Sequence, residues 1–157
     1  MQNPALGAVL LWRFAHAFTF AHPNHAAAPL PLLFITLPAI WHDQTAEHID
    51  STQLRSGLRA FAAKFAQPGS SQVDVLMDLH ERARRWRSKT LDALRVGLAK
   101  GLLRLDDRAA VLTNSEEWIP DDHHETTKRM AFLAEKLGAW CAVLTLHEIS
   151  LTLHVKF

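Results

Sequence analysis

The residues from Ala26 to Trp41 constrain the fold most strongly, because this stretch contains no charged side chain and must be kept from water. It is shorter than the roughly 20 residues that a membrane-spanning helix needs. Prolines at three positions, Pro29, Pro31 and Pro38, also make it too broken for one regular helix. The stretch is therefore predicted to be buried core, with Pro29 to Trp41 as extended or short-helical chain.

The whole chain, residues 1–157, has the size of one domain and can bury a core without disulfides or a metal. Hydrophobic residues make up 48% of it and charged residues 21%, which is typical of a packed, soluble globular protein and excludes a disordered one. A single domain without a membrane segment is expected.

The single cysteine, Cys141, cannot form an internal disulfide, which fits a reducing, cytoplasmic setting. The apolar run from Ala5 to Trp12 makes a poor signal peptide, because no basic residue precedes it and Arg13 ends it. We therefore expect a cytoplasmic protein.

Two amphipathic helices are predicted in the first half of the chain. Asn3 can cap free amides and Pro4 suits the first helical position, so a helix is expected from there to about Phe20. Asp50 or Ser51 is expected to cap a second helix. Its apolar stripe consists of Leu54, Leu58, Phe61 and Phe65.

Residues 72–113 have the order of elements found in a winged helix. After the loop signal at 67–71, a third helix is predicted up to a basic end at 82–87, and a fourth follows Ser88 and ends at Gly101. Residues 102–105 and 109–113 then read as two strands joined by a turn. The apolar side of the fourth helix is expected to consist of Leu91, Leu94 and Leu98.

The predicted fold class is thus mainly α with α+β character: a helical domain with a winged-helix-like core at about 72–113 and a short β-hairpin. Thr126 or Thr127 is expected to cap a long later helix. Its buried stripe is expected to be Met130, Leu133, Leu137, Trp140, Cys141 and Leu144. The tail, 146–157, stays open, because its alternation favours a strand while Thr145 and Glu148 have the spacing of a capping box.

Catalytic and metal-binding patterns are weak. The ten histidines include the pairs His22 with His25 and His123 with His124, but no cysteine pair or HExxH helix completes a ligand set. Cys141 lies in an apolar run that predicts an inert core thiol, and no phosphate-binding glycine motif occurs. No catalytic residue, metal or cofactor is assigned, and a histidine-dependent metallohydrolase is kept only as a third hypothesis.

Charge is distributed unevenly despite a formal net charge of +1. Residues 82–108 contain nine basic and three acidic residues, whereas 115–125 contain five acidic residues and no lysine or arginine. The basic residues either contact nucleic acid or only solvate a helix face and pair with the acidic segment. The candidate nucleic-acid-binding residues are Arg84, Arg85, Arg87, Lys89, Arg95 and Lys100.

Tryptophans supply a candidate protein interface. Trp118 and its neighbour Ile119 are apolar anchors inside the acidic segment, which favours a protein-binding role for them. The remaining four lie in apolar or amphipathic runs and are expected in the core: Trp12, Trp41, Trp86 and Trp140.

Three segments of the chain form a recognisable set. They are Asn3-Pro4-Ala5-Leu6 with Leu10-Leu11-Trp12-Arg13-Phe14, Leu30-Pro31-Leu32-Leu33-Phe34-Ile35-Thr36-Leu37-Pro38 with His42, and Ala93-Leu94-Arg95-Val96-Gly97-Leu98-Ala99-Lys100-Gly101-Leu102-Leu103. Together they resemble the middle component of bacterial three-component ABC systems. The resemblance implies a non-enzymatic adaptor that links an SMC-like ABC ATPase to a C-terminal-domain effector component, in bacterial conflict or anti-phage defence. It carries no catalytic residue over to this chain.

The alternative hypothesis is a stand-alone winged-helix DNA-binding transcriptional regulator. It predicts duplex DNA binding through the basic helices that weakens steeply as salt rises. An adaptor has no need to bind DNA on its own.

Overall fold

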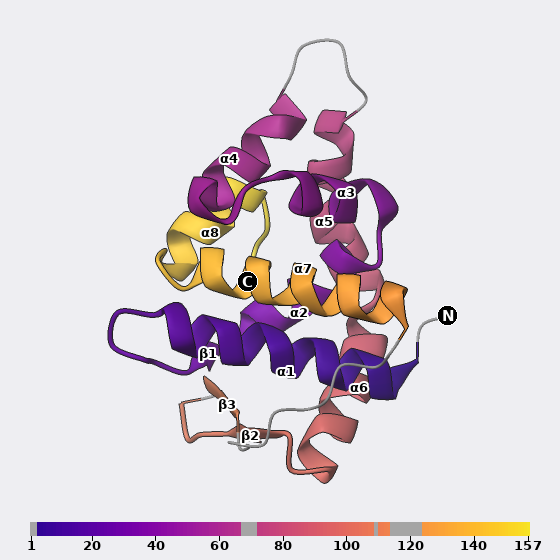
Figure 1. The fold of residues 1–157 in the computed structure, drawn as a ribbon, viewed down its shortest axis with the longest axis vertical. Coiled ribbons are helices and arrows are strands. Elements are labelled where there is room, and N and C mark those ends of the chain that lie inside the picture. The colour runs from indigo at the N-terminus through magenta and orange to yellow at the C-terminus, as the bar shows by residue number, and fades with distance from the viewer. Residues whose placement is uncertain (1–2, 67–71, 109, 114–123) are drawn as a thin grey trace.

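The computed structural model describes residues 3–66, 72–108, 110–113 and 124–157, and it shows a mainly helical protein with a small antiparallel sheet (Figure 1). The predicted fold class, mainly α with a short hairpin, is confirmed. The elements in chain order are α1 (Pro4–Ala21), β1 (Ala28–Pro29), α2 (Leu30–Ile40), α3 (Asp43–Ser51), η1 (Leu54–Ser56), α4 (Gly57–Ala63), η2 (Lys64–Ala66), α5 (Gln72–Arg85), α6 (Arg87–Ala99), β2 (Leu103–Leu105), β3 (Ala110–Thr113), α7 (Glu125–Cys141) and α8 (Leu146–Leu153).

Helix α1 is the central element of the core. It begins as predicted, with the Asn3 side chain accepting a hydrogen bond from the Ala5 amide at 2.9 Å and Pro4 at the first helical position. Length and composition alone would let α1 cross a membrane, but in the fold it packs against α6 and α7 (Figure 1). It therefore serves here as a core helix.

Helices α1 and α7 approach each other so closely that only glycine fits at one position. A Cβ on Gly138 would clash with the Phe14 carbonyl oxygen and lie 3.2 Å from the Phe18 amide nitrogen. Beside this contact, Arg13 forms an ion pair with Glu135 at 2.8 Å. The close approach lets both helices bury their apolar faces fully.

Helix α2 corrects the prediction that the proline-rich stretch is too broken for one regular helix. It is a single helix of 11 residues. Pro31 lies in the first turn, where a backbone N–H needs no partner. Pro38 lies near the end of the helix, so its ring removes one backbone hydrogen bond without stopping the last turn. Burial of the stretch is confirmed, since Leu32, Leu33 and Leu37 are fully buried.

The predicted start of the second helix at Asp50 or Ser51 is wrong, because these residues end α3. The cap of α3 is His42, whose Nδ1 accepts a hydrogen bond from the Thr45 amide at 3.4 Å. The following helix, α4, begins at Gly57. The predicted stripe is correct for Leu58, Phe61 and Phe65, which are buried, and wrong for Leu54, which is 57% exposed.

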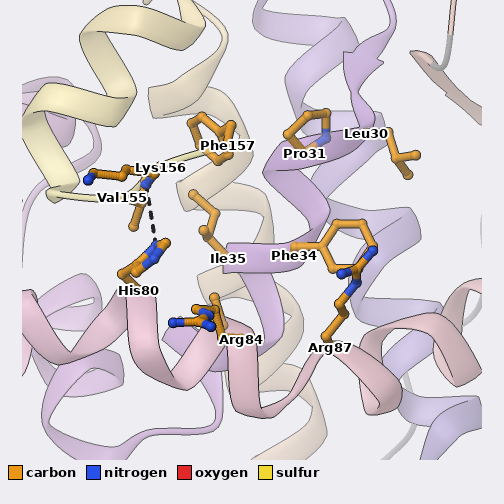
Figure 2. A pocket seen from close by; sticks show the side chains of 11 residues that line it. Leu30, Pro31, Phe34, Ile35, His80, Arg84, Arg87, Val155, Lys156 and Phe157 are labelled. Atoms are coloured by element: carbon orange, nitrogen blue, oxygen red, sulfur yellow. Dashed lines mark hydrogen bonds between the residues drawn. The ribbon is translucent and has the colours of Figure 1, made fainter.

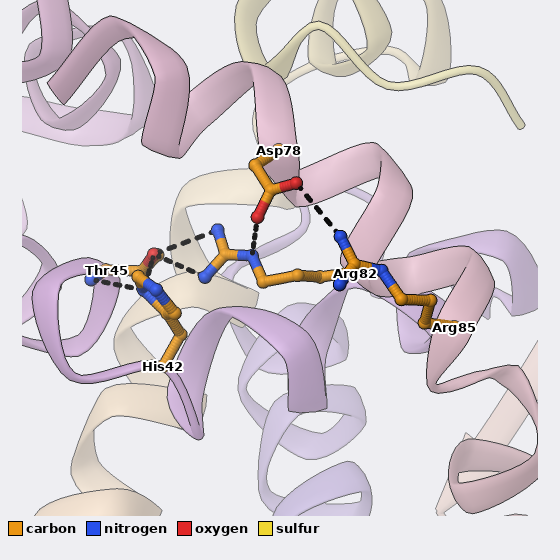
Figure 3. A network of polar contacts seen from close by, with 5 residues as sticks. All are labelled: His42, Thr45, Asp78, Arg82 and Arg85. Atoms are coloured by element: carbon orange, nitrogen blue, oxygen red, sulfur yellow. Dashed lines mark hydrogen bonds and ion pairs between the residues drawn. The ribbon is translucent and has the colours of Figure 1, made fainter. Parts of the chain in front are cut away.

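A polar network around the buried Arg82 joins α3 to α5 (Figure 3). The guanidinium donates to the Thr45 hydroxyl at 3.3 and 3.2 Å, and its Nε lies 3.8 Å from the Asp78 carboxylate. Asp78 also pairs with Arg85 at 3.2 Å, and the Thr45 hydroxyl lies 3.0 Å from His42 Nδ1. The network supplies partners for a charge that would otherwise be costly to bury.

The stability of the fold is expected to depend on the protonation of His42. Burial, and then the Arg82 guanidinium, lower the pKa of His42 below its usual 6.5, while Asp43 and Asp78 act in the opposite direction. As pH falls, the unfolded chain therefore takes up this proton before the folded chain does, and the free energy of unfolding decreases below about pH 6.5. Protonation of Nδ1 would also break the cap of α3.

Urea unfolding followed by circular dichroism, between about pH 7.5 and about pH 5.5, measures this dependence. The control is His42→Asn, because asparagine keeps an N-cap acceptor and does not titrate. The wild type should lose more stability across this range than the variant. Equal losses would contradict the role of His42. Burial is the main cause that lowers the pKa of His48 as well. A smaller dependence of stability on pH should therefore remain in the His42→Asn variant.

The predicted order of two helices and a hairpin is confirmed at 72–113, and Gly101 adopts the left-handed conformation expected of a helix end, with φ 71°. The hairpin gains a partner that sequence reasoning missed: β1 pairs antiparallel with β3, giving the strand order β1-β3-β2. The winged-helix assignment itself stays a prediction.

The predicted apolar side of α6 is wrong at two of its three positions. Leu94 is buried, but Leu91 and Leu98 are 36% and 38% exposed. Small residues face α1 instead, because a Cβ on Gly7 of α1 would lie 2.9 Å from the Ala93 Cβ. Close approach of the two backbones, not leucine packing, therefore sets which face of α6 is buried.

Helix α7 begins at Glu125 after His124, so neither Thr126 nor Thr127 is its cap. Its predicted stripe is buried at Leu133, Leu137, Trp140 and Cys141 and partly buried at Met130 and Leu144. A lysine, Lys136, is also buried, and its ammonium donates to the Ile49 and Asp50 carbonyls at 2.9 Å each. It thereby satisfies carbonyls at the end of α3.

The open question of the tail is resolved in favour of helix. Thr145 and Glu148 form the capping box of α8. His154, in a left-handed conformation with φ 53°, ends this helix, and Val155 beyond it is buried. The strand alternative is wrong, because the alternating pattern also places Ile149 and Leu153 on one buried face of a helix.

Candidate functional site

The six candidate nucleic-acid-binding residues are all exposed, on α5, on α6 or at the end of α6. Three of them pair with a carboxylate of their own helix: Arg84 with Glu81 at 3.3 Å, Arg85 with Asp78 at 3.2 Å and Arg95 with Asp92 at 3.1 Å. The Lys89 ammonium lies 5.1 Å from the Trp86 ring centroid. Part of the basic surface is therefore neutralised locally, as expected for a solvated helix face.

Two of the six, Arg84 and Arg87, lie at a pocket of about 350 Å³ that sequence reasoning did not detect (Figure 2). Arg85, Lys89, Arg95 and Lys100 are not among the residues that line it. The pocket combines apolar side chains with basic ones in a single cavity.

The pocket is formed where three distant parts of the sequence meet. Residues 30–35 of α2 form one wall, and residues 80–87 at the junction of α5 and α6 form a second. The segment 155–157 after α8 closes the third side (Figure 2). No local sequence motif predicts such a site, because its first and second segments are about 50 residues apart along the chain and its second and third are about 70 residues apart.

The interior of the pocket is apolar. Ile35 and Val155, which line it, are each only 2% exposed, and Phe34 and Ala83 are partly buried. At the outer edge, Phe157 is 48% exposed. Such a surface binds an apolar group by excluding water from it.

The edge of the pocket is basic. Arg84, Arg87 and Lys156 line it together with His80, and no described lining residue is acidic. The Lys156 amide donates to His80 Nδ1 at 3.3 Å, which fastens the segment after α8 to α5 (Figure 2). The exposed Glu81 pairs with Arg84, and the other basic side chains of this edge can contact an anionic group.

The predicted protein-interface residues Trp118 and Ile119 lie outside the described residues. Of the tryptophans expected in the core, Trp12 and Trp140 are confirmed at 2% exposure each. Trp41 and Trp86 are only partly buried and pack against each other, with ring centroids 6.1 Å apart.

Within the described part of the chain, no three histidine, cysteine, aspartate or glutamate side chains are close enough together to hold a metal ion. Candidate ligands His22 and His25 belong to the turn after α1, and His22 Nδ1 is occupied by the Asn24 amide at 3.1 Å. The pair at 123–124 is described only at His124.

Cys141 is fully buried, and burial raises the pKa of its thiol to about 12. Because the thiolate is the reactive form, we expect no reaction of the folded protein with an aromatic disulfide reagent at about pH 8 and full reaction after unfolding in guanidinium. The absorbance of the aromatic thiolate released from the reagent measures the reaction of the folded and of the unfolded protein. Rapid reaction of the folded protein would show that the thiol is accessible, contrary to the structure.

A family model matches residues 1–157, the whole chain; its description is ABC-three component (ABC-3C) system Middle Component 3. No curated protein and no solved structure matches the chain significantly.

Proposed function

Since this chain belongs to the Middle Component 3 family of ABC-three component systems, we propose that it is a non-catalytic adaptor that links an SMC-like ABC ATPase to a C-terminal-domain effector component. The system would act in the bacterial cytoplasm, in conflict or anti-phage defence. A middle component of a multi-protein system must bind other components, so its surface must contain at least one binding site for them.

The observation that carries the proposal is the apolar pocket with a basic edge. It offers burial for an apolar group and charges to orient its carrier, which suits binding. It offers little for catalysis, since the polar side chains that line it are three cations and one histidine, and Glu81, which pairs with Arg84, is exposed. The buried thiol of Cys141 is likewise unsuited to nucleophilic chemistry.

Co-purification tests the adaptor role. The tagged full chain is expressed with the products of its neighbouring genes, and the retained proteins are identified by mass spectrometry. A stable complex with an ABC ATPase and a second component is the expected result. If those neighbours are expressed and soluble but not retained, the adaptor role is wrong.

The stand-alone DNA-binding regulator is the second candidate. It is supported by the helix, helix, hairpin order and by exposed arginine and lysine side chains on α6. It predicts that the purified chain alone binds duplex DNA, with an affinity that falls steeply between about 50 and 200 mM salt. Fluorescence anisotropy with labelled duplex separates this function from the adaptor role.

A further inference from the structure

We propose that the pocket between α2, the α5–α6 junction and residues 155–157 binds an acidic segment of a partner polypeptide, which inserts one bulky apolar side chain between the walls. This inference deepens the proposed function and rests on it in one respect: the occupant is a protein partner. It adds the chemistry by which the partner is recognised and the residues that recognise it.

The apolar interior determines the first half of the occupant's chemistry. A volume of about 350 Å³ is at the small end of the range for ligand pockets, roughly 300–1,000 Å³. It therefore suits one large side chain rather than a whole helix face. Its most buried lining side chains, Ile35 and Val155, carry no hydrogen-bonding group, so a leucine, phenylalanine or similar residue is the matching anchor.

The charges at the edge of the pocket determine which polar groups the occupant should carry beside its apolar anchor. Arg84 and Arg87 project from the α5–α6 junction, and Lys156 lies across the pocket on the segment after α8 (Figure 2). The first residues of α2, Leu30 and Pro31, also line the pocket, and no side chain caps this helix end. A helix N-terminus carries partial positive charge, so all these groups favour carboxylates beside the anchor.

A nucleic acid fits the same surface less well. Phosphates could contact the cations, but the pocket interior offers no hydrogen-bonding side chain to the edge of an inserted base. An acidic peptide with an apolar anchor uses both features of the pocket at once.

Three variants test the proposal in the co-purification experiment. Ala83→Trp fills the pocket, and the double variant Arg84→Glu with Arg87→Glu reverses the edge charge. The matched control, Arg95→Glu with Lys100→Glu, makes the same change of charge on exposed side chains of α6 and its end that do not line the pocket. Circular dichroism and thermal unfolding establish that each variant folds.

The first two variants should retain at least about tenfold less of one partner, and the control should retain it like the wild type. If the wild type binds its partners and the pocket variants bind them equally well, the adaptor role stands and the pocket assignment is wrong. If both double variants lose the partner equally, overall charge rather than the pocket is responsible, and the assignment is again wrong.

A second experiment is independent of the neighbouring gene products. A displayed random peptide library is selected on the purified full chain, and bound peptides are sequenced and retested against the variants. Enrichment of aspartate and glutamate next to one bulky apolar residue, with binding lost in Ala83→Trp, is the expected result, even if no ATPase is retained.

Failure of the library to enrich such peptides overturns the proposal. The proposal is also overturned if the chain binds labelled duplex DNA more tightly than it binds any peptide, and if this DNA binding is abolished in the pocket variants but not in the control. Sedimentation of the wild type as a dimer and of Ala83→Trp as a monomer would instead identify a second copy of the chain as the occupant.

Discussion

Replacement of Gly138 by alanine should lower the free energy of unfolding by about 3 kcal/mol, which corresponds to a decrease in Tm of about 6–12 °C for a domain of this size. The added Cβ would clash with the Phe14 carbonyl oxygen of α1 and lie 3.2 Å from the Phe18 amide nitrogen. Both atoms belong to the backbone of α1, so neither can move away by a change of side-chain rotamer. The helices must separate, and the core that they share loses packing.

Gly97→Ala is the matched control, because it places the same methyl group on a helix of the core. Its Cβ would lie 2.8 Å from Leu103 Cδ1, the flexible end of a side chain, and not against backbone. Alanine also favours the helix by up to about 1 kcal/mol, so the net change should stay within about 1 kcal/mol. Thermal unfolding of both variants decides the matter. Equal effects would contradict the close approach of α1 and α7.

Replacement of Arg82 by alanine should cost about 2–4 kcal/mol of stability. The side chain is buried, and its guanidinium supplies both hydrogen bonds to the Thr45 hydroxyl and the contact to Asp78 (Figure 3). Truncation removes these bonds and the packing of the aliphatic stem. Urea unfolding at neutral pH measures the loss.

Two further variants separate the causes. Arg85→Ala removes a guanidinium that pairs with the same Asp78 but is 66% exposed, so it should change stability by no more than about 1 kcal/mol. Arg82→Met keeps most of the apolar packing without the hydrogen bonds and should recover about half of the loss. A methionine variant as stable as the wild type would show that the polar network contributes nothing to stability.

Helix ends and strands that depend on one local signal could be predicted from the sequence. Asn3 and Pro4 mark the start of α1 because a cap and an N-terminal proline act within one turn. Gly101 marks the end of α6 for the same kind of reason. The hairpin and the apolar stripe of α7 were also found, since alternation and helical spacing reflect burial directly.

The predictions are wrong where a contact between distant parts of the chain outweighs the local signal. Pro31 and Pro38 argue against a helix locally, yet burial of most of the side chains of α2 outweighs the single backbone bond that Pro38 removes. His42 is an uncommon N-cap, so α3 was missed and its last residues were mistaken for the start of the next helix. Leu91 and Leu98 looked like the core side of α6, although its smaller residues are what let α1 come close.

The fold class, the burial of the cysteine and the resemblance to the middle-component family could be predicted from the sequence, because these depend on composition, spacing and motif. The positions of the basic side chains could be read only from the folded chain: Arg84 and Arg87 line the pocket, and Arg84, Arg85 and Arg95 pair with carboxylates of their own helices. The physical reason is that the pocket requires α2, the α5–α6 junction and the segment after α8 to meet, and such a meeting is set by packing of the whole chain.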